Sequence, residues 1–201
     1  MIETIRSVLA VPQAYQLYWT LIGGAARSRI LVQDYIRPTP GDRILEIGCG
    51  PGTIVPYLPQ SEYVGFDANS HYVEKASKRF PQAKFVCETV SEYTLPQKSY
   101  FDIVLALGIV HHLNDRESVQ LFRIAHEALR PGGKLVTLDG VWAGNQSRTE
   151  RYLLAKDRGR FVRSEAEYVK LASEVFSQIK SNIRPRLLRI PYTHVILECV
   201  K

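Results

Sequence analysis

The chain has 201 residues, 45% of them hydrophobic, and a formal net charge of +6 at pH 7. A chain of this size can bury one sizeable core and is small for two, so we expect a single domain over residues 1–201. No uninterrupted apolar run approaches the roughly 20 residues that span a bilayer, so the sequence predicts no transmembrane segment.

Cysteine usage and the N-terminus both favour the cytoplasm. Cys49, Cys87 and Cys199 form no CxxC pair, so the sequence predicts neither a disulfide framework nor a zinc site, and no other metal site is indicated. The apolar stretch 8–26 resembles a signal peptide only faintly, because Glu3 and Pro12 do not fit such a signal. We therefore expect a cytoplasmic protein with reduced thiols.

Strand-like and helix-like segments alternate from residue 43 onwards, which predicts a parallel sheet with helices on both faces. The near-continuous apolar run 101–107 indicates a strand buried on both sides. The predicted strands are 43–48, 63–68, 84–89, 101–108 and 134–140. The predicted helices are a short one from Thr53, then 69–80 and 116–129, the last stopped by Pro131-Gly132-Gly133.

The end of the chain departs from this alternation. Segments 181–190 and 193–200 are both strand-like with only Pro191-Tyr192 between them, so they should pair as an antiparallel hairpin. The preceding stretch 141–180 is longer than one crossover helix requires. Two helices fit there, over 148–156 and 165–176, with Ser164 as the N-cap of the second and a break at Asp157-Arg158-Gly159.

The excess positive charge lies in the last third of the chain. Residues 1–140 hold 14 Lys+Arg and 14 Asp+Glu, whereas residues 141–201 hold 12 against 6, which accounts for the whole net charge. Clustered basic groups can bind phosphates or carboxylates, and an ordinary solvated surface explains them equally well. The basic positions considered are Arg148, Arg151, Lys156, Arg158, Arg160, Arg163, Arg184, Arg186 and Arg189.

A glycine-rich loop follows the first predicted strand. Residues 44–53 read Ile-Leu-Glu-Ile-Gly-Cys-Gly-Pro-Gly-Thr, and Asp67 ends the next strand nineteen residues after Gly48. Glycines let the backbone approach a ligand closely, and an acid at this place can accept both ribose hydroxyls. Dinucleotide sites usually read G-x-G-x-x-G so that a helix N-terminus receives a pyrophosphate. The G-x-G-x-G spacing here favours a nucleoside cofactor without phosphates.

These residues resemble the cofactor-binding signature of class I S-adenosylmethionine-dependent methyltransferases, and the stretch 129–135 is also similar to that family. The resemblance implies a Rossmann-like α/β sheet, mostly parallel, with an inverted C-terminal strand inserted beside the fifth and helices on both faces. It implies S-adenosylmethionine as the cofactor. The expected contacts are the backbone of Gly48, Cys49, Gly50 and Gly52 with the methionine and ribose portions, Glu46 near the methionine ammonium, and Asp67 on the ribose hydroxyls.

The adenine position departs from the family pattern. The family usually has an acid after the third strand, and the aligned residue here is Thr89, preceded by Glu88. We expect Glu88 to take that role with Thr89 and Val90 nearby. Phe66 is expected in the core, whereas Ala68 and Asn69 should lie at the ring face, and Leu107 ends the fourth strand beside the cofactor.

Histidines near two strand ends are the candidate bases. His111 and His112 follow the fourth strand, in a region that resembles the family's contact with the sulfonium end of the cofactor, and imidazole titrates near neutrality. His111 is the preferred candidate, although such a histidine is often structural.

The topology offers a second arrangement. His194 begins the inverted strand and should come close to Asp139 at the end of the fifth strand, since both lie at the carboxyl edge of the sheet. We therefore expect a catalytic Asp139–His194 pair with Tyr192 as a polar wall, because a carboxylate fixes the tautomer of an imidazole and raises its basicity.

Segments 1–40 and 141–180 are expected to build the acceptor pocket, since this fold commonly uses such additions for that purpose. Tyr15, Tyr18 and Trp19 have helical spacing, and this helix is either a lid over the cofactor or ordinary packing on the sheet. Gly23-Gly24 would be its hinge, and Arg27 or Arg29 would reach the cofactor carboxylate.

The sequence as a whole predicts a methyltransferase that acts on a small, anionic acceptor, most readily at oxygen. An RNA methyltransferase is the alternative within the fold, although a charge of +6 is modest for a nucleic-acid partner. A non-catalytic subunit that only binds the cofactor is a further alternative, and the shortened glycine pattern disfavours a nicotinamide-dependent oxidoreductase. The sequence leaves the oligomeric state open.

Overall fold

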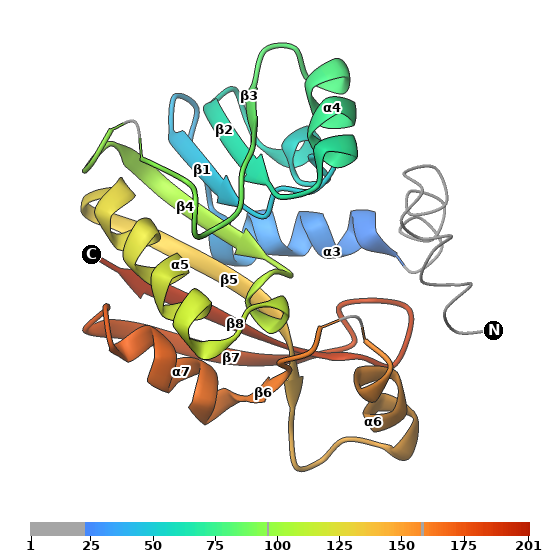
Figure 1. Cartoon of the computed structure of the whole chain (residues 1–201). Helices are drawn as coiled ribbons and strands as arrows, with labels where there is room; N and C mark the ends of the chain where they lie inside the picture. The colour runs from blue at the N-terminus through green and yellow to red at the C-terminus, as the bar shows by residue number, and fades with distance from the viewer. Residues whose placement is uncertain (1–22, 96, 158) are drawn as a thin grey trace.

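The computed structural model describes residues 23–95, 97–157 and 159–201. These residues share one sheet with the strand order β3-β2-β1-β4-β5-β8-β7, and the short strand β6 pairs with the end of β5 (Figure 1). The strands are β1 (Arg43–Ile47), β2 (Glu62–Asp67), β3 (Lys84–Cys87), β4 (Phe101–Leu107), β5 (Leu129–Trp142), β6 (Arg163–Ser164), β7 (Gln178–Pro185) and β8 (Thr193–Val200).

The strand order reverses at β1, which is parallel to β2 on one side and to β4 on the other. In an open α/β sheet this reversal opens a crevice at the carboxyl ends of the strands, where ligands bind. Strand β1 forms here because Ile44, Leu45 and Ile47 are fully buried on its two faces. The glycine loop therefore begins at the point of the sheet where a ligand site is expected.

Helices cover both faces of the sheet (Figure 1). On one face, α3 and the π-helix η1 bury Leu31, Tyr35 and Ile36 against β1, β4, β5 and β8. On the other face, α5 and α7 form the larger core cluster with the same central strands. The helices are α3 (Gly24–Ile30), η1 (Leu31–Ile36), η2 (Val55–Tyr57), α4 (Ser70–Arg79), η3 (Val110–His112), α5 (Asp115–Ala128), α6 (Arg148–Ala155) and α7 (Glu165–Ser173).

The five parallel strands and the helices between them agree with the prediction to within a few residues, except that β5 is longer at its start.

Helix starts are fixed by side-chain caps. Asn114, Ser147 and Ser164 each form a reciprocal capping box with a glutamate three residues later, which satisfies amide groups that have no partner within the helix. The predicted N-cap role of Ser164 is confirmed.

The closing hairpin is confirmed in its topology but not in its boundaries. Strand β8 lies between β5 and β7 and is antiparallel to both. However, β7 ends at Pro185, five residues earlier than predicted, and residues 186–192 form a loop. Arg186 has a φ of 58°, a left-handed backbone that ends the strand, and its amide donates to the Tyr192 carbonyl at 3.3 Å, which closes the loop.

The predicted lid lies mostly outside the described residues, and so do Tyr15, Tyr18 and Trp19. The part of segment 1–40 that is described packs on the sheet through α3 and η1. The insertion 141–180 divides in two, because α7 belongs to the core whereas α6 and the residues after it reach the carboxyl edge. Among the helices of the described ranges, none has the length and apolar character needed to cross a bilayer.

Candidate functional site

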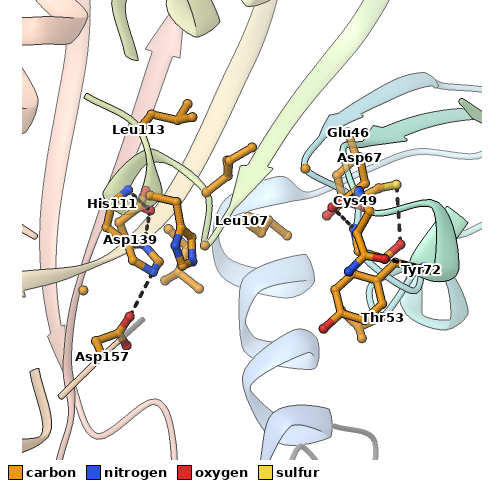
Figure 2. Close-up of a pocket in the computed structure, with 18 of the residues that line it drawn as sticks. Glu46, Cys49, Thr53, Asp67, Tyr72, Leu107, His111, Leu113, Asp139 and Asp157 are labelled. Carbon is orange, nitrogen blue, oxygen red and sulfur yellow. Dashed lines mark hydrogen bonds and ion pairs between the residues drawn. The ribbon is translucent and has the colours of Figure 1, made fainter. Parts of the chain in front are cut away.

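A cavity of about 920 Å³ lies at the carboxyl ends of β1, β2, β4 and β5. Figure 2 shows two groups of side chains in it. One group surrounds the glycine loop and includes Glu46, Cys49 and Asp67. The other surrounds His111, with Asp139 and Asp157 beside it. Leu107, at the end of β4, lies between the two groups, and all of these residues line the same cavity.

Asp67 and the glycine loop are joined directly. The Gly50 amide donates to Asp67 Oδ2 at 2.9 Å, and the Asn69 amide donates to Oδ1 at 2.8 Å. Gly50 has a φ of 52°, a conformation that favours glycine, and a Cβ built there meets no atom within 4 Å. The loop therefore presents bare backbone to open space beside a carboxylate.

Among the predicted loop residues, Gly52 differs in that it is not part of the cavity lining, whereas Pro51 and Thr53 on either side of it are. A Cβ on Gly52 would come within 2.9 Å of the Phe80 ring at the end of α4, and its φ is 70°. Gly48, Cys49 and Gly50 do line the cavity, as expected. The third glycine of the motif therefore packs closely against the end of α4.

Glu46 is buried at the end of β1 and accepts a hydrogen bond from the Tyr63 hydroxyl. Burial raises the pKa of the Glu46 carboxyl to about 8, although the Tyr63 hydrogen bond and the positive charge of Arg27 oppose the shift. Glu46 and Arg27 both line the cavity. A zwitterionic ligand group, such as that of a methionine, could place its ammonium at the Glu46 carboxyl and its carboxylate at the Arg27 guanidinium.

The predicted adenine-side residues also line the cavity: Ala68, Asn69, Glu88, Thr89, Val90 and Leu107. The Thr89 hydroxyl donates to Glu92 at 2.7 Å within a local turn. Glu88 is thus the better placed of the two to act on a ligand. Phe66 is in the core as predicted and stacks on Tyr93 at 3.8 Å between ring centroids, although it also borders the cavity.

His111 is held by the buried carboxylate of Asp139. Asp139 Oδ1 lies 2.7 Å from His111 Nδ1 and accepts the His111 amide at 3.1 Å. On the other side of the ring, Nε2 lies 3.3 Å from Asp157 Oδ1. Burial lowers the pKa of His111, but the two carboxylates outweigh it and raise the pKa to about 9. Burial also raises the pKa of Asp139, against the effect of His111.

Asp139 does not pair with His194, which corrects the prediction. Asp139 is opposite Val195 in the register of β5 against β8, whereas His194 is opposite Gly140. Because side chains alternate between the two faces of a sheet, Asp139 and His194 lie on opposite faces. Both were correctly expected at the carboxyl edge, and both line the cavity.

His194 is 4% exposed, and its Nδ1 has no hydrogen-bond partner among the described residues. Burial, and then the positive charges of Arg27 and His111, lower the pKa of His194 to about 3. Its ring lies 4.8 Å from that of Tyr192, which also lines the cavity as predicted. His194 is therefore neutral at physiological pH and a much weaker base than His111.

Few basic residues of the last third reach the cavity. Within the described ranges, only Lys156 of those considered lines it, and Arg27 of α3 adds a second cation. Arg163 is buried and structural, since its guanidinium donates to Asp115 and to the Leu113 carbonyl at 2.7 and 2.8 Å. Arg158 lies outside the described residues.

Sequence reasoning missed Asp157, which was assigned only to a chain break. Its carboxylate accepts from the Tyr192 hydroxyl at 2.7 Å and from the Gly159 amide at 2.8 Å, besides facing His111. Asp157 follows α6 within the insertion. The one feature of the sequence that could have indicated a functional residue there is an acid two positions before a glycine. Its partners come from remote parts of the chain, so spacing alone could not identify them.

The comparison with known families decides the class. A family model described as a methyltransferase domain matches residues 44–133, which contain the glycine loop, Asp67 and His111. Residues 44–133 are a methyltransferase domain. The predicted class I fold is confirmed, including the inverted strand β8 that completes the sheet beyond the matched residues.

The methyltransferase domain has relatives with different acceptors. The 27-O-demethylrifamycin SV methyltransferase of Amycolatopsis mediterranei is 37% identical over 107 residues, 49% of this chain and 39% of that protein. A probable tRNA methyltransferase 9B of Mus musculus is 30% identical over 145 residues, 70% of this chain and 30% of that protein. The chain spans well under two thirds of either relative.

Among solved structures, the fold matches Haemonchus contortus phosphoethanolamine N-methyltransferase 2 in complex with phosphomonomethylethanolamine and S-adenosylhomocysteine. The TM-score is 0.78 at 16% identity, and the match covers 98% of this chain and 59% of that chain. At this identity the likeness concerns the fold. This likeness of fold extends over nearly all of the chain.

The residues present fit S-adenosylmethionine, the cofactor of this class. Open space lies over Gly50, the Asp67 carboxylate lies beside it, and the Glu46 carboxyl and the Arg27 guanidinium line the same cavity. No phosphate-binding helix N-terminus is needed for such a ligand, which agrees with the tight glycine spacing.

Proposed function

We propose that this chain transfers a methyl group from S-adenosylmethionine to a small, anionic acceptor at an oxygen atom. The observation that carries the proposal is the His111–Asp139 pair, which borders the same cavity as the glycine loop. An imidazole held by a buried carboxylate is suited to removing a proton from a hydroxyl nucleophile. Methyl transfer itself asks mainly for alignment of the nucleophile and exclusion of water.

We assign the roles as follows. The cofactor supplies an electrophilic methyl group on a positively charged sulfur. When bound, the cofactor would supply this methyl group to the acceptor oxygen, and His111 Nε2 would take up the proton of the acceptor hydroxyl. Asp139 holds Nδ1 at 2.7 Å and stabilises the imidazolium that results. The products are the methylated acceptor, S-adenosylhomocysteine and a protonated His111.

An anionic acceptor is supported by Lys156, a cation at the cavity in addition to the Arg27 considered for the cofactor. The exposed Lys156 ammonium lines the cavity and can bind a phosphate or carboxylate group. The Haemonchus contortus protein, whose fold this chain shares, was crystallised with a phosphate-bearing acceptor. That acceptor receives its methyl group at nitrogen, so the choice of oxygen here depends on the His111 pair.

Labelled methyl transfer tests the proposal. The protein is incubated with methyl-labelled S-adenosylmethionine and a metabolite extract fractionated by charge, with the His111→Gln variant as control. We expect label in an anionic fraction, in a product stable to mild acid and base as a methyl ether is, and loss of the label with the variant. Label in no fraction, or in neutral compounds alone, would contradict the proposal.

RNA methylation is the second candidate, favoured by the similarity to the probable tRNA methyltransferase. The same labelled reaction with total tRNA in place of the metabolite extract separates the two. Transfer to tRNA that weakens steeply with added salt would support the second candidate, because phosphate contacts are salt-dependent.

A further inference from the structure

We propose that Asp157 is a displaceable positioning residue, which occupies the place at His111 Nε2 that the acceptor hydroxyl takes during the reaction. The inference rests on the proposed role of His111 as base. His111 and Asp157 both line the cavity, and their contact lies at its wall (Figure 2). An acceptor that gives its proton to Nε2 must approach that nitrogen within hydrogen-bond distance, where the Asp157 carboxylate now lies.

The two carboxylates on His111 are not equivalent. Asp139 Oδ1 lies 2.7 Å from Nδ1 and also accepts the His111 amide, and its side chain is 1% exposed. Asp157 Oδ1 lies 3.3 Å from Nε2, and its side chain is 23% exposed. The contact with Asp157 is thus the longer and the more accessible to solvent. Asp139 holds the ring permanently, whereas Asp157 can leave it.

Asp157 keeps its other partners when it leaves His111. Its Oδ2 accepts from the Tyr192 hydroxyl at 2.7 Å, and its Oδ1 accepts from the Gly159 amide at 2.8 Å. A small rotation of the carboxylate can therefore release Nε2 without leaving a buried charge unpaired, which would cost several kcal/mol. The hydrogen bonds of Tyr192 and Gly159 lower the cost of the displacement.

The backbone around Asp157 is less free to move. The Phe161 amide donates to the His111 carbonyl at 2.9 Å, and a Cβ on Gly159 would lie 2.0 Å from His111 Cδ2. Gly159 therefore packs directly against the ring it borders. The displacement we infer is a movement of the Asp157 side chain, with the ring and the adjoining backbone kept in place.

The displacement also changes the proton affinity of His111. With both carboxylates in contact the pKa of His111 is raised to about 9. At neutral pH the ring is then an imidazolium, with a proton on both nitrogens, and cannot accept a proton from the acceptor. Loss of the Asp157 contact lowers this pKa and favours a neutral ring next to the acceptor. The groups in contact with His111 are Asp139 from β5, Asp157 after α6 and the adjacent His112 ring at 4.3 Å, and the buried His194 from β8 is close enough for its pKa to respond to the charge of His111.

The first test is an NMR titration of ring-labelled histidine, which needs neither cofactor nor acceptor. His111 is assigned with the His111→Gln variant, and the wild type is compared with Asp157→Asn. Asp34→Asn, which changes an exposed aspartate remote from the cavity, is the matched control. We expect a midpoint near 9 in the wild type and in the control, and a midpoint lower by at least about one unit in Asp157→Asn. An unchanged midpoint in Asp157→Asn would overturn the inference.

The second test measures access to Nε2 with diethyl pyrocarbonate, an electrophile that modifies neutral imidazole. Modification of His111 is followed by peptide mass spectrometry at neutral pH. We expect Asp157→Ala to react about tenfold faster than the wild type, since a one-unit fall in pKa gives a tenfold larger neutral fraction, and Asp157→Glu to restore protection. Equal rates in the wild type and Asp157→Ala would contradict a carboxylate that occupies Nε2. Both tests are independent of methyl transfer, so their failure and that of the proposed function are distinguishable.

Discussion

Asp67 joins the two halves of the cofactor site at the scale of single residues. Its two oxygens already accept the Gly50 and Asn69 amides, so the carboxylate is fixed in orientation before any ligand arrives. Its remaining lone pairs are available for a pair of ribose hydroxyls. This arrangement could be predicted because it depends on neighbours along two consecutive strands, and a loop that needs positive φ requires glycine.

Replacing Asp67 should weaken cofactor binding. Asp67→Asn keeps the size of the side chain but removes the charge and one acceptor atom, and hydrogen bonds to charged groups contribute about 1.5–3 kcal/mol. We expect the affinity for S-adenosylhomocysteine, measured by calorimetry, to fall about 10- to 100-fold. Glu74→Gln, which alters an exposed pair with Lys78 on α4, should bind like the wild type. Equal affinities for the two variants would be incompatible with the site described.

His194 should make the protein sensitive to acid. Its pKa is lowered to about 3 in the folded state from 6.5, so below pH 6.5 the unfolded chain binds a proton that the folded chain does not. Stability is therefore lost as the pH falls from about 6.5 towards 3. At pH 5 this difference amounts to roughly 2 kcal/mol.

Urea unfolding at pH 5 and pH 7 checks this expectation. The loss of stability between pH 7 and pH 5 should be smaller in His194→Gln than in the wild type by roughly 2 kcal/mol. The comparison between variants is needed because Glu46, with a pKa raised to about 8, makes the folded state more stable as the pH falls, which is opposite to the effect of His194. His71→Gln on the exposed side of α4 is the control. The same pH dependence in all three proteins would show that His194 is not a buried neutral imidazole.

At the scale of elements, the positions of the strands along the chain could be predicted. The face of the sheet on which Asp139 and His194 lie could not. Both Asp139 and His194 were placed at the correct edge, yet one residue of register between β5 and β8 decides which face each occupies. The pairing of Asp139 with His111 depends on how η3 turns back over β5. Asp157 is a similar case, because the insertion after α6 has no periodicity that fixes where it folds.

The segment after α6 should tolerate no side chain at Gly159. A Cβ there would lie 2.0 Å from His111 Cδ2 and 2.8 Å from the His111 carbonyl oxygen, whereas a Cβ at Gly144 meets no atom within 4 Å. We expect Gly159→Ala to cost roughly 1–3 kcal/mol, a fall of several degrees in Tm, and Gly144→Ala to leave Tm unchanged or slightly higher. Scanning calorimetry measures both. A Tm for Gly159→Ala equal to that of Gly144→Ala would show that the segment does not pack on His111.

At the scale of the whole molecule, alternation of strands and helices was enough to predict the sheet and its mostly parallel sense. The antiparallel hairpin was predicted from the short connection between its strands, and the place of the inverted strand beside the fifth was implied by the family resemblance. Burial of apolar strands between two helical layers leaves few other arrangements. It was harder to predict which parts of segments 1–40 and 141–180 pack on the sheet and which line the cavity. Segment 24–36 and α7 bury apolar faces on the sheet. Among the described residues of segments 1–40 and 141–180, Arg27 of α3 and residues of and after α6 line the cavity.

The central claim is that the carboxyl edge of this sheet binds an adenosyl cofactor between the glycine loop and Asp67. Calorimetric titration of the full chain with S-adenosylhomocysteine tests it most directly. The account predicts saturable binding with one site per chain, and competition by S-adenosylmethionine but not by NAD. Absence of any binding at millimolar ligand would contradict it.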